Sequence, residues 1–132
     1  MSEDRSRSED RSRQRPPRYR LSAPARLRVE REFRAVFEQG VRASGSLIAV
    51  YALKATSEWK TGFVAGRRVG GAVARNRAKR LMREAFRLNR HRIDGPCHLV
   101  IVARTGCAAA RRHEVEDELL TLLVKVGLHD GP

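Results

Sequence analysis

The chain has 132 residues, a length that fits one domain with an additional tail. It has 28 Lys and Arg residues against 15 Asp and Glu residues, for a formal net charge of +13, and the clustering of the basic residues indicates a polyanionic partner. Nucleic acid is the first candidate. A membrane surface is the second candidate, but it would need a basic helix with a strong apolar face left uncovered, and we expect no membrane partner. The sequence has no apolar run long enough to span a bilayer and no apolar N-terminal segment. The two cysteines, Cys97 and Cys107, fit a reduced cytoplasmic protein rather than a secreted one.

The first 24 residues combine Ser, Arg, Asp and Glu without apolar periodicity, and the unit SEDRSR occurs twice, at Ser2–Arg7 and Ser8–Arg13. Such a segment cannot bury enough apolar surface to offset the entropy that ordering would cost. We therefore expect a disordered basic Ser/Arg-rich tail over residues 1–24, a folded domain over residues 25–128 and a short C-terminal tail over residues 129–132.

The first half of the domain is predicted to hold a short helix and two strands. The helix covers Glu30–Glu38, where apolar residues recur at helical spacing, and Gly40 ends it. Ser46–Lys54 is rich in apolar and β-branched residues and predicts a strand. A turn separates it from a second predicted strand, Lys60–Arg67, and we expect these two strands to pair antiparallel.

The second half is predicted to hold two helices with one strand between them. Gly70 and Gly71 break the chain and open a helix over Ala72–Arg92. His98–Arg104 is a nearly continuous apolar run of strand length, so burial on both faces is expected. Ala109–Val126 is predicted as an amphipathic final helix. The order of elements indicates a two-layer α/β domain.

The long helix divides into an apolar arc and a basic arc at about 100° per residue. The apolar arc consists of Ala74, Ala78, Leu81, Met82, Ala85 and Leu88. The basic arc consists of Arg75, Asn76, Lys79, Arg80, Arg83, Arg87 and Arg90, with Arg77 and Glu84 between the arcs. Like charges at this spacing repel by roughly a few tenths of a kcal/mol per pair, so a helix that tolerates them favours a polyanion as partner. The N–H groups at the start of the helix predict a further phosphate site.

Three motifs give the sequence a resemblance to a known family. They are Phe33-x-x-x-Phe37-x-x-Gly40, Arg67-Arg68-Val69-Gly70, and the run AVARNRAKRLMRE from Ala72 to Glu84, which contains Arg75-Asn76-Arg77. With Val100–Arg104 as the last strand, they resemble the protein subunit of bacterial ribonuclease P over Leu27–Leu128. Gly71 stands where the family pattern has Asn, which leaves the helix cap to the glycine backbone.

The resemblance implies an α+β fold, a two-layer sandwich in which helices pack on a small sheet. The implied order is α-β-β-β-α-β-α, with an unusual left-handed βαβ crossover of the kind found in a domain of one ribosomal protein. General handedness rules favour the opposite hand, so this topology comes from the resemblance alone.

The same resemblance implies the protein component of ribonuclease P, the endoribonuclease that removes the 5′ leader from precursor tRNA. The catalytic ribonuclease P RNA holds the active site and its Mg²⁺ ions in this family, so the protein is expected to supply no catalytic residue and no metal ligand, and to need no further protein partner. The residues expected to bind the RNA subunit are Arg67, Arg68, Arg75, Asn76, Arg77, Lys79, Arg80, Arg83 and Arg87.

The leader of precursor tRNA is expected to bind in a cleft between the first helix and the sheet, lined by Phe33, Phe37 and Tyr51. Stacking of bases on such rings tolerates any base sequence. For one of the two phenylalanines ordinary core packing is the alternative, and Phe63 and Phe86 are expected in the core.

Other functions fit the residues less well. The four histidines have no ligand-like spacing with the cysteines, and no carboxylate pair or Ser/His constellation indicates that the polypeptide is itself a nuclease. A non-enzymatic ribosomal or general RNA-binding protein is the alternative. A DNA-binding module with the basic helix in a major groove is weaker, because no helix-turn-helix pattern precedes that helix.

Overall fold

The computed structural model describes residues 25–27, 30–54 and 58–129. The predicted N-terminal tail lies outside the described residues, as does all of the predicted C-terminal tail except His129. The division into a tail over residues 1–24 and a domain over residues 25–128 therefore stays a prediction.

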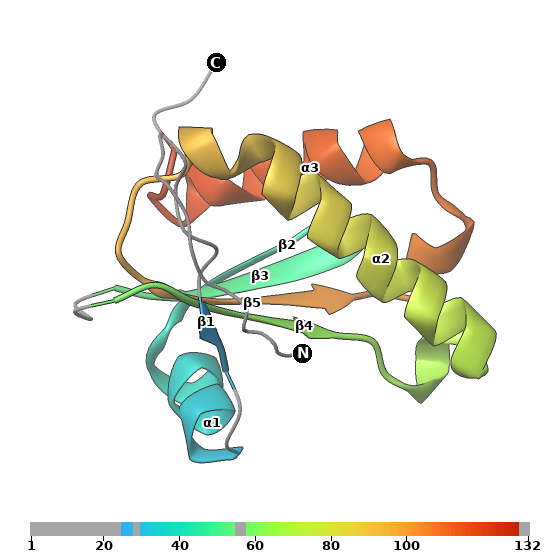
Figure 1. The fold of residues 1–132 in the computed structure, drawn as a ribbon, viewed down its shortest axis with the longest axis horizontal. Helices are drawn as coiled ribbons and strands as arrows, with labels where there is room; N and C mark the ends of the chain where they lie inside the picture. Colours follow the sequence, from blue (N-terminus) through green and yellow to red (C-terminus); the bar gives the residue numbers. More distant parts are fainter. Residues whose placement is uncertain (1–24, 28–29, 55–57, 130–132) are drawn as a thin grey trace.

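Five strands and three α-helices follow one another in the described part of the chain (Figure 1). In order they are β1 (Ala25–Arg26), α1 (Glu30–Gln39), β2 (Val41–Ser44), β3 (Ile48–Leu53), β4 (Lys60–Val64), α2 (Ala72–Asn89), β5 (His98–Ala103) and α3 (Arg112–Lys125). Short 3-10 helices occur at η2 (Arg67–Val69), η3 (Arg90–Arg92) and η4 (Cys107–Ala109). From α1 onward the order is the predicted α-β-β-β-α-β-α. Among the described helices, none is long and apolar enough to cross a membrane.

Three element boundaries differ from the sequence prediction by three residues each. β4 stops at Val64, so Arg67, the predicted last residue of the strand, lies in η2. α2 is regular as far as Asn89, and its last predicted turn is the 3-10 helix η3. α3 begins at Arg112, because the residues before it belong to η4 and an extended link. The two-residue strand β1 is an addition that the sequence did not indicate.

The strands form one sheet in the order β1-β4-β5-β3-β2. β5 pairs parallel with β4 and antiparallel with β3. The predicted antiparallel pairing of the strands at Ser46–Lys54 and Lys60–Arg67 is therefore wrong, because β5 lies between them. Its nearly continuous apolar sequence favours this central position, where a strand is buried on both faces. The chain passes from β4 through α2 to β5 in a left-handed crossover, as the resemblance implies (Figure 1).

Helices cover both faces of the sheet (Figure 1). α2 and α3 lie side by side on one face, and α1 lies on the other. The main core fills the α2–α3 side and includes Leu99 and Ile101 of β5, whereas Val100 packs under α1 with Leu27 and Val36. The expected burial of β5 on both faces is thus confirmed. The α+β sandwich of sheet and helices is confirmed as well, and α1 adds a small cover on the second face.

The buried face of α2 is shifted relative to the predicted apolar arc. It consists of Ala78, Met82, Ala85, Phe86 and Asn89. Only partly buried are Ala74, Leu81 and Leu88. Phe86 lies in the core as expected, and it packs edge to face against the partly buried Phe63, with ring centroids 5.9 Å apart. This shift leaves the outward side of α2 to basic residues.

One carboxylate fastens the hairpin of β2 and β3 to α3. Glu118 accepts hydrogen bonds from the backbone N–H groups of Leu47 and Ile48, both at 2.7 Å. It also accepts from the N–H of Ser46 at 3.2 Å and from its hydroxyl at 3.1 Å. Bonds to a charged acceptor are stronger than neutral ones, so Glu118 holds the hairpin firmly against the helical layer.

Candidate nucleic-acid interface

The solvent-facing side of α2 carries a ridge of basic side chains. Asn76, Arg80, Arg83 and Arg87 are exposed along it. Glu84 is the single acid of α2, and it pairs with Arg87 at 2.8 Å. The hydrogen bond from Arg87 lowers the pKa of Glu84, so this carboxylate stays ionised and offsets one positive charge. Apart from the neutral Asn76, the rest of the ridge is cationic.

The flank of α2 that turns toward β4 holds basic side chains in fixed positions. Arg75 is half-buried, and its Nη1 donates to the carbonyl of Gly70 at 3.2 Å. Lys79, one turn further along, is also half-buried. The guanidinium of Arg83 lies 5.8 Å from the ring centroid of Phe63. The contacts of Arg75 and Arg83 orient these two cations before a ligand binds, which lowers the entropy that binding costs.

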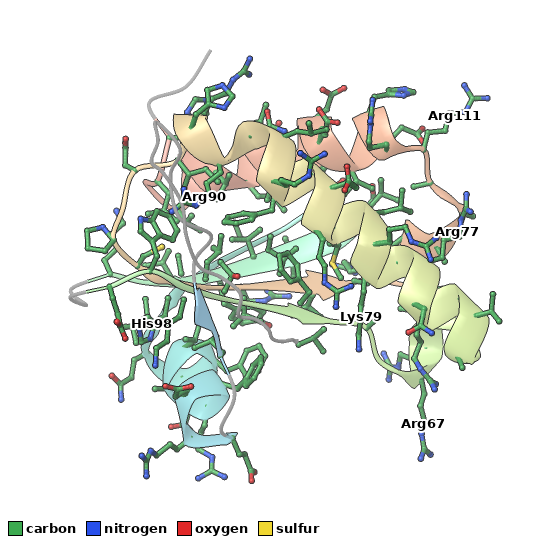
Figure 2. The ribbon with its side chains drawn as sticks, in the orientation of Figure 1. Arg67, Arg77, Lys79, Arg90, His98 and Arg111 are labelled. Atoms are coloured by element: carbon green, nitrogen blue, oxygen red, sulfur yellow. The ribbon has the colours of Figure 1, made fainter. Side chains whose placement is uncertain are left out.

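Arg77 lies on the opposite flank of α2, in agreement with its predicted place between the two arcs. Its Nε donates to the carbonyl of Ala108 in η4 at 2.8 Å. Figure 2 shows Arg67, Arg77 and Arg111 at the end of the molecule where α2 begins. The basic surface therefore extends from the ridge to η2 and to the start of α3.

Gly70 shapes the turn into α2. Its φ of 142° lies in the region that glycine adopts readily and other residues do not, and a Cβ there would come within 2.8 Å of the Cβ of Ala74. Gly71 follows as the N-cap, with extended backbone and no side-chain cap bond. The helix therefore lacks the side-chain cap that the Asn of the resembled pattern would offer. The exposed Arg67 and Arg68 stand immediately before this turn.

On the other face of the sheet, three aromatic rings lie together between α1 and β3. The rings of Phe33 and Phe37 are stacked with centroids 6.4 Å apart, and Phe37 meets Tyr51 edge to face at 4.8 Å. Phe37 is 40% exposed, and the other two are half-buried. Phe33 also contacts the small core under α1 and rests on Gly62 of β4. The structure thus brings the three predicted cleft residues together, and Phe33 combines a packing role with partial exposure.

A hollow of about 280 Å³ opens beside Tyr51 on this face. Its lining consists of Arg42, Ala49, Tyr51, Arg68, Val102, Ala103, Arg104 and Thr105. Three arginines, from β2, from η2 and from the end of β5, line the hollow with one aromatic residue, and no Asp or Glu belongs to the lining. Arg68 was predicted to serve with the α2 residues, but it lies in this hollow.

Arg42 and Arg104 are residues of this surface that the sequence did not assign to a site. Arg104 follows the buried strand β5 directly, and only its place at a strand end hinted at a role. Arg42 lies opposite Tyr51 in the register of β2 and β3, and such cross-strand neighbours share one face. The sequence could have pointed to Arg42 only if the pairing of these two strands had been known.

The described residues offer no group of three or more His, Cys, Asp or Glu side chains that could hold a metal ion. Cys97 and Cys107 are free, buried thiols. Burial raises the pKa of Cys97 to about 12 and that of Cys107 to about 11, so both stay protonated at neutral pH. They serve as packing residues of the main core.

A small α+β domain with a basic helix on one face of its sheet, and with clustered aromatic rings beside an arginine-lined hollow on the other, has the features of an RNA-binding protein. Cations of this kind meet phosphates, and exposed rings stack on unpaired bases. Comparison with known proteins gives the particular family. Residues 21–127 match the family model described as Ribonuclease P, and the chain belongs to the ribonuclease P protein family. It is thus a subunit of the endoribonuclease that processes the 5′ end of tRNA.

Relatives cover nearly the whole described domain. The ribonuclease P protein component of Syntrophomonas wolfei is 34% identical over 109 residues, which are 82% of this chain and 92% of that protein. That of Desulfovibrio desulfuricans is 38% identical over 117 residues, with 85% and 90% covered. The structure of the RNase P protein from Thermotoga maritima is similar with a TM-score of 0.67 and 28% identity, over 76% of this chain and 96% of that one. A Staphylococcus aureus RNase P protein, at 19% identity and a TM-score of 0.71 over 81% of this chain and 99% of that one, shows the same fold.

Proposed function

We propose that this chain assembles with the catalytic ribonuclease P RNA through the basic side of α2, and binds the 5′ leader of precursor tRNA in the groove between α1 and the sheet. The observation that carries this proposal is the separation of two differently built surfaces on opposite faces of one sheet. One is a dense cationic ridge, and the other combines aromatic rings with arginines.

The α2 surface suits a structured RNA with a dense array of phosphates. Arg80, Arg83 and Arg87 are exposed on its outward side, and Arg75 and Arg77 are anchored by backbone carbonyls on its two flanks. Arginine forms paired hydrogen bonds to phosphate and stacks on bases, which favours it for this task over lysine. The assignment of Asn76 and Lys79 to this surface belongs to the same proposal.

The groove suits a single strand of arbitrary sequence. The exposed Phe37 and the half-buried Tyr51 form an edge-to-face pair of rings, and bases of any kind stack on aromatic rings for roughly 1–3 kcal/mol each. Arg68 and Arg104 lie beside Tyr51 and supply positive charge for the strand's phosphates. A leader differs in sequence from one tRNA gene to another, so a reader of shape and charge fits it better than a reader of base edges.

The protein is proposed to assist the reaction without taking part in the chemical step. Its described residues do not fit a Mg²⁺ site, since hard divalent ions need several oxygen ligands and no such cluster is present there. We assign the Mg²⁺ ions to the RNA subunit. The protein's part is to hold the leader and the RNA subunit in place, in the cytoplasm.

The proposed binding of the catalytic RNA by α2 is tested by Arg80→Ala. Arg80 is exposed and does not make the backbone contact that Arg77 makes. The matched control is Arg34→Ala on α1, whose side chain is 58% exposed. We expect Arg80→Ala to weaken binding to the catalytic RNA and to reduce the slope of log K against log salt by roughly 0.7–0.9. An unchanged slope, or an equal change in the control, would show that Arg80 meets no phosphate.

The proposed binding of the leader between α1 and the sheet is tested by Phe33→Ala in the reconstituted holoenzyme. We expect weaker binding of precursor tRNA that carries a leader and unchanged binding of mature tRNA. Equal losses for both substrates would argue against a leader groove.

The RNA that copurifies with the chain from its host identifies the partner. One long structured RNA that cleaves precursor tRNA, and that the protein stimulates at low Mg²⁺, supports the proposal. Recovery of ribosomal RNA alone, without such stimulation, would favour a general RNA-binding protein instead.

A further inference from the structure

Arg42 and Tyr51 form a cross-strand pair beside the aromatic groove. They are direct neighbours in the antiparallel register of β2 and β3. The Nε of Arg42 donates a hydrogen bond to the hydroxyl oxygen of Tyr51 at 3.0 Å. The guanidinium carbon of Arg42 lies 5.7 Å from the centroid of the Tyr51 ring, within the range of cation–π attraction.

This pair fixes the ring of Tyr51 on two sides. Phe37 meets the ring edge to face at 4.8 Å, and Arg42 holds its hydroxyl group. A ring held in this way loses little further freedom when a base stacks on it, so less of the stacking energy is spent on ordering. Arg42 itself is exposed.

The bond to Tyr51 uses only one of the five N–H donors of the Arg42 guanidinium. Within the described part of the chain, no hydrogen bond or ion pair takes its two terminal amino groups. Arg42 lines the hollow of about 280 Å³ together with Arg68, Arg104 and Thr105. The hollow is near the lower end of the ~300–1,000 Å³ typical of small-molecule pockets, a size that suits one nucleotide rather than a helix of RNA.

We propose that Arg42 bridges the protein and the leader: its Nε–H holds Tyr51 for stacking, while its terminal amino groups bind the phosphate of the same leader nucleotide. Arg42 is therefore both a phosphate ligand and the positioning residue of Tyr51. The inference rests on the proposed leader groove, and it adds β2 to the elements that form it.

The bridge predicts different effects for the loss of charge and for the loss of the hydroxyl group. Arg42→Gln removes the phosphate contact, so we expect leader-dependent affinity to fall about three- to tenfold, and the salt slope of precursor binding to become less steep by roughly 0.7. Tyr51→Phe keeps the ring and every charge, so affinity falls while the slope stays the same. Arg42→Lys keeps the charge, so the slope is restored although the bond to Tyr51 is weakened.

The experiment uses the holoenzyme reconstituted from the full chain and its catalytic RNA. Binding is measured over a range of salt concentrations for precursor tRNAs with leaders of increasing length and for mature tRNA. Lys125→Gln on α3, exposed and beyond the opposite face of the sheet, is the charge control. We expect the loss in Arg42→Gln to arise at a single leader length and to persist for longer leaders, with no loss for mature tRNA and none in Lys125→Gln.

The outcomes separate this inference from the proposal on which it rests. An unchanged salt slope in Arg42→Gln, while Tyr51→Ala still lowers leader-dependent affinity, would overturn the bridge and leave the leader groove standing. A loss in Tyr51→Ala that is equal for precursor and mature tRNA would overturn the leader groove itself. A reduced slope in Arg42→Gln that Arg42→Lys restores, for leader-bearing substrates alone, supports both.

Discussion

Gly62 of β4 determines where the ring of Phe33 lies, so a single added methyl group tests the aromatic groove. A Cβ at Gly62 would come within 2.7 Å of Cε1 and 2.9 Å of Cζ of Phe33. Carbon atoms in contact are normally about 3.5–4.0 Å apart, so the ring would have to move outward by about 1 Å. We therefore expect Gly62→Ala to displace Phe33 from the surface of the sheet.

Two opposing terms set the size of the effect of Gly62→Ala on stability. Overpacking of a filled site costs about 1–3 kcal/mol. Replacing glycine within a strand gains about 0.5–1 kcal/mol, because the unfolded chain has less freedom to lose. The free energy of unfolding should thus fall by about 0–2.5 kcal/mol. Complete loss of one stacking contact, at roughly 1–3 kcal/mol, would lower leader-dependent affinity by up to about 150-fold.

The assay compares the affinity of the reconstituted holoenzyme for precursor tRNA with that for mature tRNA. Gly66→Ala is the matched control, because a Cβ at Gly66 has no heavy atom within 4 Å. The double variant Gly62→Ala/Phe33→Leu separates strain from function, since the smaller side chain relieves the contact but leaves no ring for a base. We expect it to recover stability and to keep the loss of leader affinity. Wild-type leader affinity in both variants would refute the stacking role of Phe33.

Three further predictions concern stability and reactivity. Glu118→Ala leaves the partly buried N–H groups of Leu47 and Ile48 without their acceptor, so urea unfolding should show a loss of about 2–4 kcal/mol; a loss under 0.5 kcal/mol would contradict the clamp on the β2–β3 hairpin. Lys60 contacts Glu32 at 2.6 Å, and this hydrogen bond raises the pKa of Lys60. The stabilisation from this pair, roughly 1 kcal/mol, is therefore complete below the usual lysine pKa of about 10.5. It is lost as the pH rises through the pKa of Lys60 in the folded chain. A double-mutant cycle of Lys60 and Glu32 at pH 8 and pH 11.5 would detect this loss. Burial raises the pKa of Cys97 to about 12, so this thiol in the folded chain should resist alkylation at pH 8. The free energy of unfolding should fall as the pH rises above about 9, because the thiol of the unfolded chain then ionises. Rapid alkylation of the folded chain, measured by mass spectrometry, would show that the Cys97 thiol is not buried.

The sequence predicted elements better than their pairing. Hydrophobic periodicity places helices and strands wherever the local pattern is strong, as it does for α2 and β5. The two strands predicted at Ser46–Lys54 and Lys60–Arg67 were expected to form a hairpin, because a short connection usually joins paired strands. Their separation follows from β5, which has the most apolar sequence and takes the central position between them. Such competition between strands is a property of the whole sheet and leaves no local signal.

The candidate site shows the same division between local and long-range information. The basic ridge of α2 follows from helical periodicity within one segment, so its exposed members could be assigned from the sequence. The hollow beside Tyr51 is made of residues from β2, β3, η2 and β5. Arg42 contributes to it only because the β2–β3 register places it opposite Tyr51. No spacing along the chain connects these residues, so their meeting depends on the fold.

The placement of η2 explains how two surfaces on opposite faces of a sheet can serve one RNA complex. η2 follows β4 and leads through Gly70 into α2, so it stands at the end of the sheet where the basic surface begins. Arg68 of η2 reaches the hollow beside Tyr51, whereas Arg67 projects from the body of the molecule at the start of α2 (Figure 2). Successive side chains of a 3-10 helix differ by about 120° in direction, because the helix has about three residues per turn. Two adjacent arginines can therefore point in different directions. In the proposed arrangement, a leader in the groove and an RNA along α2 would come nearest to each other at the η2 end of the molecule.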